Sequence, residues 1–368
     1  MTQVWEKLQY LYKVFEQTLI DFENQTNHCS MNAVIQNLLK SNLQVILTGA
    51  PGTGKTYTAK QVACAMTGDD PKAEVQPHIE SVQFHPGYDY SDFVIGMKPV
   101  LLDEDGKEVK PEESGKGKLQ VSFRWKKGIF MDFAQKAKDA YDNAEDKGNA
   151  PKFVFLIDEI NRADLSRVFG ELFSLLEEEY RYPNNKKGVT LPDGKDFVIP
   201  RNLYIIGTMN DIDRSVESMD FALRRRFAWY EVKAEQSEGI ISEKVSDGNA
   251  AAKLKAAMKN LNAVIGGENL KLMNGTETDL RLGTAYQLGG AIFAKFEKCG
   301  GNFDALWNNH ISNVLGEYLR GRRDREDILK ELKRIFDQAV GVGSGEQSSG
   351  QNANENPAPI AQPETPQP

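Results

Sequence analysis

The chain has 368 residues, 40% of them apolar, which is enough for a full α/β domain and a smaller companion with its own core. Its formal net charge of −8 argues against a protein that coats nucleic acid or anionic lipid through its overall field. No apolar run approaches the roughly 20 residues of a membrane span, and the start MTQVWEKLQY lacks the plan of a signal peptide, so we expect a cytoplasmic protein without a membrane partner.

The first part of the chain predicts helices followed by a buried strand. Residues 1–40 carry apolar positions at helical spacing, and we expect them to pack as helices on the main domain. Residues 43–48, LQVILT, form a short β-branched run that stops at a glycine, which is typical of a buried parallel strand. The segment from Lys55 to Met66 that follows has a helical pattern.

Two hairpins and two more strands are expected further along. A polar, Gly- and Lys-rich stretch suggests the tip of a hairpin insertion near 97–125, and turn residues suggest another near 182–198. Residues 153–157 and 203–208 read as buried strands, with a helix from about Leu165 to Glu179 between them. Strands that alternate with helices predict an α/β fold with a parallel sheet.

These patterns divide the chain into an α/β domain over 41–232 and a helical domain over 233–340. Helical patterns in the second domain cover 250–261, 285–298 and 311–339. The tail, 341–368, has no aromatic residue and is dominated by Gly, Ser, Gln, Asn and Pro. Such a composition cannot offset its ordering entropy by burial, and we expect it to be disordered.

The segment between the first strand and its helix carries the most specific motif in the chain. Residues 49–56 fill the pattern GxxxxGK[ST] in the strand–loop–helix context that a phosphate loop, or Walker A motif, requires. Glycines let backbone N–H groups point at the phosphates, Lys55 reaches the β and γ phosphates, and the Thr56 hydroxyl is placed to bind Mg²⁺. The expected nucleotide-binding residues here are Gly49, Pro51, Gly52, Thr53, Gly54, Lys55, Thr56 and Tyr57.

Two acids follow the second apolar strand directly, as in a Walker B motif. Asp158 is expected to bind nucleotide and hold Mg²⁺ together with Thr56, and Glu159 to polarise the attacking water. A solvated strand end is the alternative interpretation. The phosphate loop upstream favours the catalytic one.

Further motifs resemble the McrB family, the AAA+ NTPase subunit of a modification-dependent restriction system. They are DEINRADLSRVFGELFSLLEE from Asp158, GTMNDIDRS from Gly207, ALRRRF from Ala222 and FHPGYDYSDFVIGMKP from Phe84. The stretch MNDIDRS fits the family pattern MNxxDRS and is the most specific of them. The resemblance covers roughly residues 40–320. It implies an AAA+ P-loop NTPase with a parallel-sheet core, β-hairpin insertions and a C-terminal α-helical lid domain.

The resemblance also implies roles for residues near the nucleotide. Asn210 would be the polar sensor that aligns the attacking water, with a backbone-satisfied Asn as the alternative. Asp213 and Arg214 would belong to a loop beside the nucleotide, unless they form a helix cap or a surface ion pair. Arg281, in DLRLGTAYQLGGAIF, is the candidate nucleotide sensor of the lid; a structural arginine is equally compatible with that position.

The run Arg224, Arg225, Arg226 resembles the arginine-finger segment. One guanidinium from it would enter the neighbouring subunit's site and stabilise charge on the transferred phosphoryl group. We favour Arg224 and then Arg225. Three consecutive arginines could instead form a basic surface.

The family implies partners that the chain itself does not supply. We expect a homo-oligomeric, hexameric ring that hydrolyses GTP or ATP with Mg²⁺ and acts with a McrC-like nuclease subunit. DNA would be reached through that partner or through pore hairpins, where lysines such as Lys126 and Lys186 lie, although these could simply be solvated. A MoxR-like ATPase that remodels proteins is the alternative. Only about 40 residues precede the expected motor, so we expect no DNA-reading domain among them.

Overall fold

The computed structural model describes residues 31–103, 105–109, 119–210, 212, 224–272, 275–280 and 282–341. The predictions for residues 1–30, for the tail beyond residue 341 and for the tip of the first hairpin lie outside these ranges. Residues 31–42 are helical. No helix in the described part of the chain is both long and apolar enough to cross a lipid bilayer.

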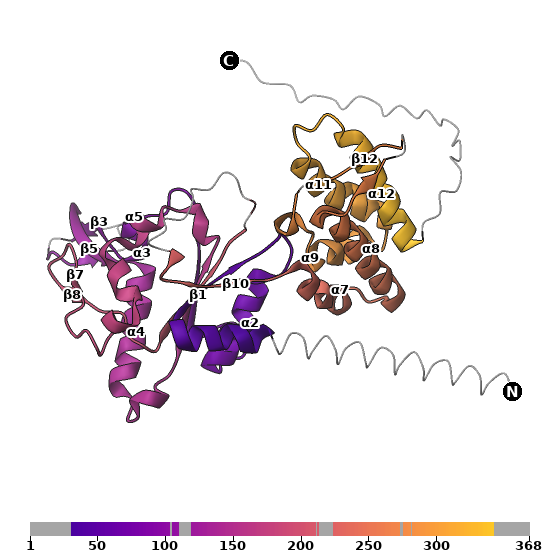
Figure 1. The fold of residues 1–368 in the computed structure, drawn as a ribbon. Helices are drawn as coiled ribbons and strands as arrows, with labels where there is room; N and C mark the ends of the chain where they lie inside the picture. The colour runs from indigo at the N-terminus through magenta and orange to yellow at the C-terminus, as the bar shows by residue number, and fades with distance from the viewer. Residues whose placement is uncertain are drawn as a thin grey trace, which may run out of the picture.

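A five-stranded parallel sheet forms the centre of the first half of the molecule (Figure 1). The strand order is β10-β1-β9-β6-β2, and each neighbouring pair runs parallel. The strands are β1 (Gln44–Thr48), β2 (Ile79–Gln83), β6 (Phe153–Asp158), β9 (Leu203–Thr208) and β10 (Ala228–Glu231). The predicted parallel-sheet core is confirmed, although the edge strand β10 was not among the expected elements, because its residues are only partly buried.

Both faces of the sheet are covered. Val45 and Leu47 of β1 pack with helix α2 (Lys55–Thr67), whereas Ile46 packs on the opposite face with helices α3 (Tyr90–Phe93) and α4 (Ile129–Asn143). This alternation follows from the period of two in a strand, and it explains why β1 reads as a continuous apolar run.

Four phenylalanines fill the second face. Their rings contact each other in an aromatic cluster: Phe93, Phe130, Phe155 and Phe169. Phe93 and Phe130 are stacked with centroids 4.7 Å apart, and both are fully buried. Aromatic pairs of this kind contribute about 0.5–1.5 kcal/mol beyond their burial.

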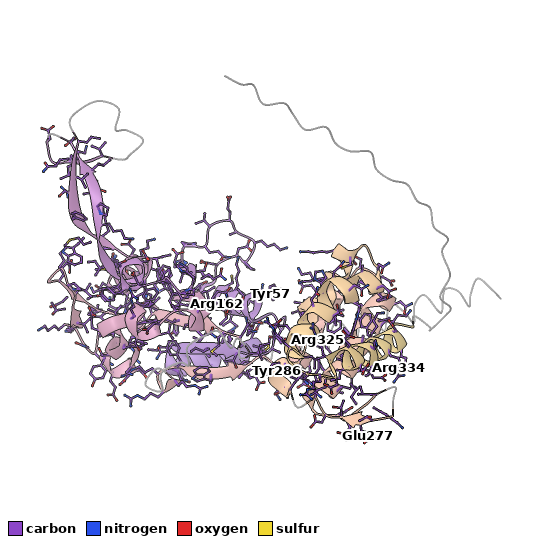
Figure 2. The ribbon with its side chains drawn as sticks, turned by 90° about the horizontal axis from the view of Figure 1, so that it is seen from above. Tyr57, Arg162, Glu277, Tyr286, Arg325 and Arg334 are labelled. Carbon is purple, nitrogen blue, oxygen red and sulfur yellow. The ribbon has the colours of Figure 1, made fainter. Side chains whose placement is uncertain are left out.

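The first expected hairpin is present. Strands β3 (Ile95–Leu102) and β5 (Gln120–Lys127) pair antiparallel along their whole length, and β4 (Glu108–Val109) pairs with the end of β3. The hairpin projects away from the sheet (Figure 2). Met97 and Phe123 lie on the same face and are 55% and 63% exposed, so this face is apolar and open.

Two of the lysines expected to give the first hairpin positive charge lie next to acids. Lys126 Nζ is 2.6 Å from Glu108 Oε2, and Lys127 Nζ is 3.9 Å from Asp132 Oδ1. The second expected hairpin is short and consists of β7 (Val189–Thr190) and β8 (Asp196–Phe197).

The single helix expected from Leu165 to Glu179 is wrong. Helix α5 (Leu165–Phe169) ends at Gly170, and 3₁₀ turns η4 (Gly170–Leu176) and η5 (Glu178–Tyr180) follow. Gly170 has φ 51°, a left-handed conformation that favours glycine, and a Cβ there would lie 3.1 Å from the ring of Tyr90. The tertiary contact therefore stops the helix despite a favourable local pattern.

The remaining elements form a mainly helical region beside the sheet (Figure 1). In chain order they are η6 (Ala234–Ser237), α7 (Glu238–Lys244), α8 (Gly248–Gly266), β11 (Leu270–Lys271), β12 (Glu277–Thr278), η7 (Thr284–Tyr286), α9 (Gly290–Phe293), η8 (Ala294–Cys299), α10 (Phe303–Leu306), η9 (Trp307–Ile311), α11 (Ser312–Tyr318) and α12 (Arg325–Val340). The helices expected over 285–298 and 311–339 are thus each broken, the first around Gly289 and the second between α11 and α12. This region has a separate core around Leu254, Phe293 and Phe336.

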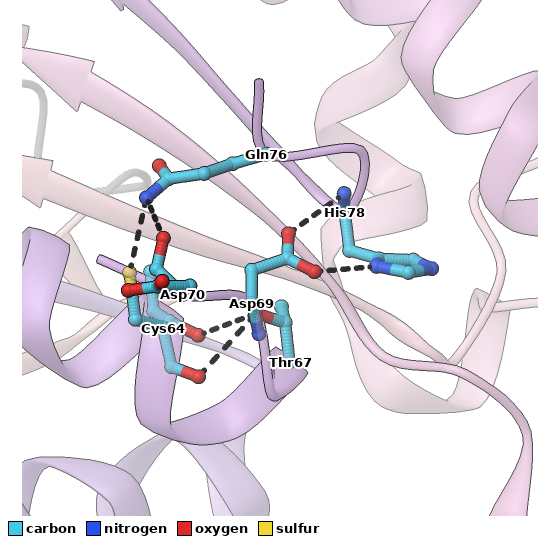
Figure 3. A network of polar contacts seen from close by, with 7 residues as sticks. Cys64, Thr67, Asp69, Asp70, Gln76 and His78 are labelled. Carbon is cyan, nitrogen blue, oxygen red and sulfur yellow. Dashed lines mark hydrogen bonds and ion pairs between the residues drawn. The ribbon is translucent and has the colours of Figure 1, made fainter. Parts of the chain in front are cut away.

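The connection from α2 to β2 is fixed by polar contacts (Figure 3). Asp69 accepts a hydrogen bond from the backbone N–H of His78 at 3.0 Å and lies 2.8 Å from its Nδ1. Gln76 Nε2 donates to the backbone oxygen of Asp70 at 2.9 Å. These bonds hold the end of α2 beside the edge of the sheet.

Candidate active site

The phosphate loop follows β1 and leads into α2. Gly49, Gly52 and Gly54 have φ values of 138°, 79° and 81°, which side chains with a Cβ rarely adopt. Gly54 is the N-cap of α2, so the first N–H groups of that helix face the loop. The glycines in the motif are therefore required by the backbone path of the loop.

Lys55 lies along the inside of the loop. Its ammonium group is buried and donates hydrogen bonds to the carbonyl oxygens of Gly49 at 3.0 Å and Ala50 at 2.9 Å. A cavity of about 240 Å³ opens beside it. The cavity is lined by Gly52, Gly54, Lys55, Thr56, Tyr57, Asp158, Glu159, Thr208, Met209, Asn210 and Ala291.

Asp158, at the carboxyl end of β6, accepts hydrogen bonds from two hydroxyl groups. Thr56 Oγ1 donates to Asp158 Oδ1 at 2.9 Å, and Thr208 Oγ1 donates to the same oxygen. The three side chains come from α2, β6 and β9, whose ends meet at this edge of the sheet. Hydroxyl and carboxylate oxygens are the ligands that Mg²⁺ prefers, so Thr56 and Asp158 fit the ion that a P-loop NTPase uses.

Glu159 is held in a rarely adopted conformation next to Asp158. Its φ is 52°, in the left-handed region that non-glycine residues seldom occupy. Asn210 Nδ2 donates to Glu159 Oε1 at 3.0 Å, and Arg162 Nε donates to Oε2 at 3.3 Å. The donors orient a partly buried carboxylate toward the cavity.

The arginine run lies at the opposite edge of the sheet. Arg224, Arg225 and Arg226 precede β10, and Ala228 of β10 is paired with Val45 near the beginning of β1. Gly49, at the phosphate loop, is four residues further along, or roughly 13 Å at about 3.3 Å per residue. The arginines are therefore separated from the cavity of the same chain by the length of the sheet.

The three arginines differ in their surroundings. Arg226 forms an ion pair with Glu177, Nη2 to Oε1 2.8 Å. The Arg224 guanidinium lies 5.1 Å from the centre of the Trp229 ring, and Trp229 Nε1 donates to the Arg224 carbonyl oxygen at 2.9 Å. Arg224 and Arg225 are exposed, so these two are presented on the surface.

The helical region contacts the phosphate loop directly. The backbone N–H groups of Gly289 and Ala291 donate to the carbonyl oxygens of Pro51 at 3.0 Å and Gly52 at 2.9 Å. A Cβ on Gly289 would overlap the backbone of Gly52 and Thr53. Only glycine at position 289 permits this approach.

We expect Gly289→Ala to lower the free energy of unfolding by about 1–3 kcal/mol, because the added methyl group must push the helical region off the loop. Chemical denaturation of the variant and the parent measures this difference. Gly87→Ala is the matched control, since a Cβ there meets nothing closer than 3.6 Å. Equal losses in both variants would contradict the packing argument.

Comparison with known proteins decides the family. Residues 44–227, half of the chain, match the AAA domain of the dynein-related subfamily. The chain belongs to this AAA family. The matched residues include the phosphate loop, both acids, Asn210 and the arginine run.

Two curated relatives of this AAA protein are components of restriction enzymes by name. The chain is 33% identical over 273 residues to the type IV methyl-directed restriction enzyme EcoKMcrB subunit of Escherichia coli (strain K12), with 73% of this chain and 50% of the relative covered. It is 29% identical over 213 residues to the type II restriction enzyme BsuMI component YdiS of Bacillus subtilis (strain 168), with 52% and 57% covered. The chain thus spans about half the length of the curated relatives that it matches, and the resemblance to McrB is confirmed.

Among solved structures, that of C. elegans PCH-2 is similar at 16% identity over 86% of this chain and 68% of the other, with a TM-score of 0.26. This likeness is too low to bear on the arrangement of the AAA fold.

The structure brings together most of the residues expected at the AAA site, and it adds two polar side chains that contact the acids of that site. Lys55, Thr56, Asp158, Glu159 and Asn210 all line the cavity, with Tyr57 at its exposed side. Thr208 and Arg162 were not among the expected residues. Each lies inside a motif quoted above, Thr208 in GTMNDIDRS and Arg162 in DEINRADLSRVFGELFSLLEE, and that position was the signal in the sequence.

Three expected residues lie outside the described part of the AAA chain. These are Asp213, Arg214 and Arg281. Their roles beside the nucleotide stay predictions.

Proposed function

We propose that the chain hydrolyses a nucleoside triphosphate, GTP or ATP, with Mg²⁺, as the ring-forming motor subunit of a McrBC-like restriction system in the cytoplasm. The observation that carries this proposal is the convergence of a phosphate loop, a Thr–Asp pair and an Asn–Glu pair on one cavity. Such a set supplies the parts that phosphoryl transfer to water needs.

Each residue has a separate task in this proposal. Lys55 exchanges its two loop carbonyls for the β and γ phosphates. Thr56 and Asp158 hold Mg²⁺, which neutralises charge on the phosphates when bound. Glu159 accepts a proton from the attacking water, and Asn210 keeps the carboxylate and the water aligned. Arg162 helps to hold the Glu159 carboxylate in place.

The position of the arginine run supports a shared site. Arg224 and Arg225 cannot reach their own phosphate loop across the length of the sheet. They are exposed, and in a ring of identical subunits, which we propose to be a hexamer, the same edge faces the next subunit's cavity. Hydrolysis would then depend on assembly.

The restriction role comes from the relatives. Both curated relatives are named as subunits or components of restriction enzymes, which supports a chain that works with others. We propose that DNA cleavage belongs to a separate McrC-like nuclease subunit, and that the motor reaches DNA through this partner or through its hairpins. The chain itself is not proposed to be a nuclease.

The test is steady-state phosphate release with GTP and ATP in parallel at several protein concentrations, with Lys55→Ala as the blank. We expect turnover per subunit to rise steeply with concentration, because each site needs a neighbour. A preference for GTP favours the McrB-like role, and a preference for ATP favours a protein-remodelling role. Turnover per subunit that is constant at all concentrations contradicts the shared site.

A further inference from the structure

Beneath the arginine run lies a buried arginine that the proposed reaction does not use. Arg181 is fully buried and follows the 3₁₀ turn η5. Its guanidinium donates to the carbonyl oxygen of Leu203 at 2.8 Å and, through Nη2, to Gln44 Oε1 at 2.8 Å. Burial lowers the pKa of Arg181 to about 9. Burying a cation costs free energy of folding unless the cation is well hydrogen-bonded, so the partners of Arg181 matter for stability.

The Gln44 side chain is hydrogen-bonded both to Arg181 and to the arginine run. Its side chain is 3% exposed, at the beginning of β1. While Oε1 accepts from Arg181, Nε2 donates to the carbonyl oxygens of Arg226 at 2.6 Å and of Leu176 at 2.9 Å. One amide group therefore joins the buried guanidinium to the backbone of the arginine run.

The orientation of the Gln44 amide is fixed by this arrangement. Arg181 has only N–H groups to offer, so it must face the amide oxygen, and the amide nitrogen must then face the two carbonyls. Glu177 follows Leu176 directly in the chain. Its carboxylate pairs with the Arg226 guanidinium, with Oε1 2.8 Å from Nη2. Arg226 is thus held at its backbone by Gln44 and at its side chain by Glu177.

We propose that Gln44, oriented by Arg181, is a positioning residue that sets the Arg224–Arg226 segment for the neighbouring subunit's active site. Gln44 lies at the edge of the sheet opposite the phosphate loop, so it acts on the site of the next subunit and leaves the site of its own subunit unaffected. This inference rests on the shared site proposed above. A displacement of a catalytic group by about 1 Å can cost up to about a hundredfold in rate.

Gln44→Glu separates the two functions of the amide. The carboxylate still accepts from Arg181 and pairs with its charge, but it places an oxygen where Nε2 donated to the Arg226 and Leu176 carbonyls. We expect nucleotide affinity to be unchanged and turnover to fall by about tenfold to a hundredfold. Turnover at the parent's rate would overturn the proposal.

An experiment with mixed subunits distinguishes a displaced arginine run from a general structural defect of the variant. A Glu159→Gln subunit has an inactive site but an intact arginine run, whereas a Gln44→Glu subunit has an intact site and a displaced run. We expect a mixture of the two to release more phosphate than either alone, since the first completes the site of the second. A structural defect confined to the Gln44→Glu subunit would not be rescued, and a mixture that gains nothing overturns the proposal.

The same mixture with Arg224→Ala, Arg225→Ala or Arg226→Ala in place of Gln44→Glu tests the shared site itself. If none of the three arginine variants is rescued, the shared site is wrong and the inference falls with it. If an arginine variant is rescued and Gln44→Glu is not, only the inference is wrong.

Glu177→Gln gives a second route if Gln44→Glu does not fold. Glu177 is partly exposed, and its substitution removes the ion pair to Arg226 without burying a charge. The expected pattern is the same: unchanged nucleotide affinity, lower turnover and rescue by Glu159→Gln subunits. Unchanged turnover in this variant would overturn the proposal.

Discussion

Replacing Glu159 by glutamine is expected to lower phosphate release by about 10²–10⁴-fold while nucleotide still binds, because the amide cannot accept the proton of the attacking water. Glutamine has the size of glutamate, and its oxygen can still accept from Asn210 or Arg162. Single-turnover phosphate release and equilibrium binding of a fluorescent nucleotide measure the two effects separately.

The control for this variant is Glu145→Gln, which removes a charge from an exposed position away from the cavity. It should hydrolyse nucleotide like the parent. If Glu159→Gln also kept the parent's rate, another group would have to be the base, and the Asn210–Glu159 pair would lose its assigned role.

Removing the proposed arginine finger is expected to have an effect at least as large. One of Arg224→Ala and Arg225→Ala should lower turnover by about 10³-fold or more with nucleotide affinity retained, because the guanidinium stabilises charge only in the transition state. Parallel steady-state assays on the two variants identify which arginine it is. Arg226→Ala is the matched comparison, since its guanidinium is already paired with Glu177 in the same subunit.

The outcome for Arg226 is informative in either direction. A smaller loss in Arg226→Ala than in its two neighbours fits a residue that holds the segment in place. The largest loss in Arg226→Ala would mean that the ion pair with Glu177 breaks on assembly and that Arg226 is the finger.

The sequence by itself determined the parts of the site that are contiguous in the chain. The phosphate loop is one run of eight residues, from Gly49 to Thr56, and its glycines have the positive φ values that the motif requires. Asp158 and Glu159 directly end a buried strand, and parallel strands place their carboxyl ends at one edge of the sheet. Their meeting with Thr56 follows from that local order and from the general geometry of α/β sheets.

Local patterns failed where a distant segment decided the backbone. The helix predicted over 165–179 ends at Gly170 because the ring of Tyr90 packs against it, and Tyr90 is 80 residues away. The helix predicted over 285–298 breaks at Gly289, where the backbone approaches Gly52. Helix periodicity carries no information about such contacts.

Only the tertiary structure decided which distant residues contact one another at the two ends of the sheet. Gln44 and Arg181 are 137 residues apart, and no spacing in the sequence indicates that one amide joins a buried guanidinium to the Arg226 backbone. The placement of the arginine run at the edge of the sheet opposite the phosphate loop likewise depends on the pairing of β10 with β1. The physical reason is the same in each case: the partners are brought together by packing of the sheet, and hydrogen bonds between segments distant in the chain leave no local pattern in the sequence.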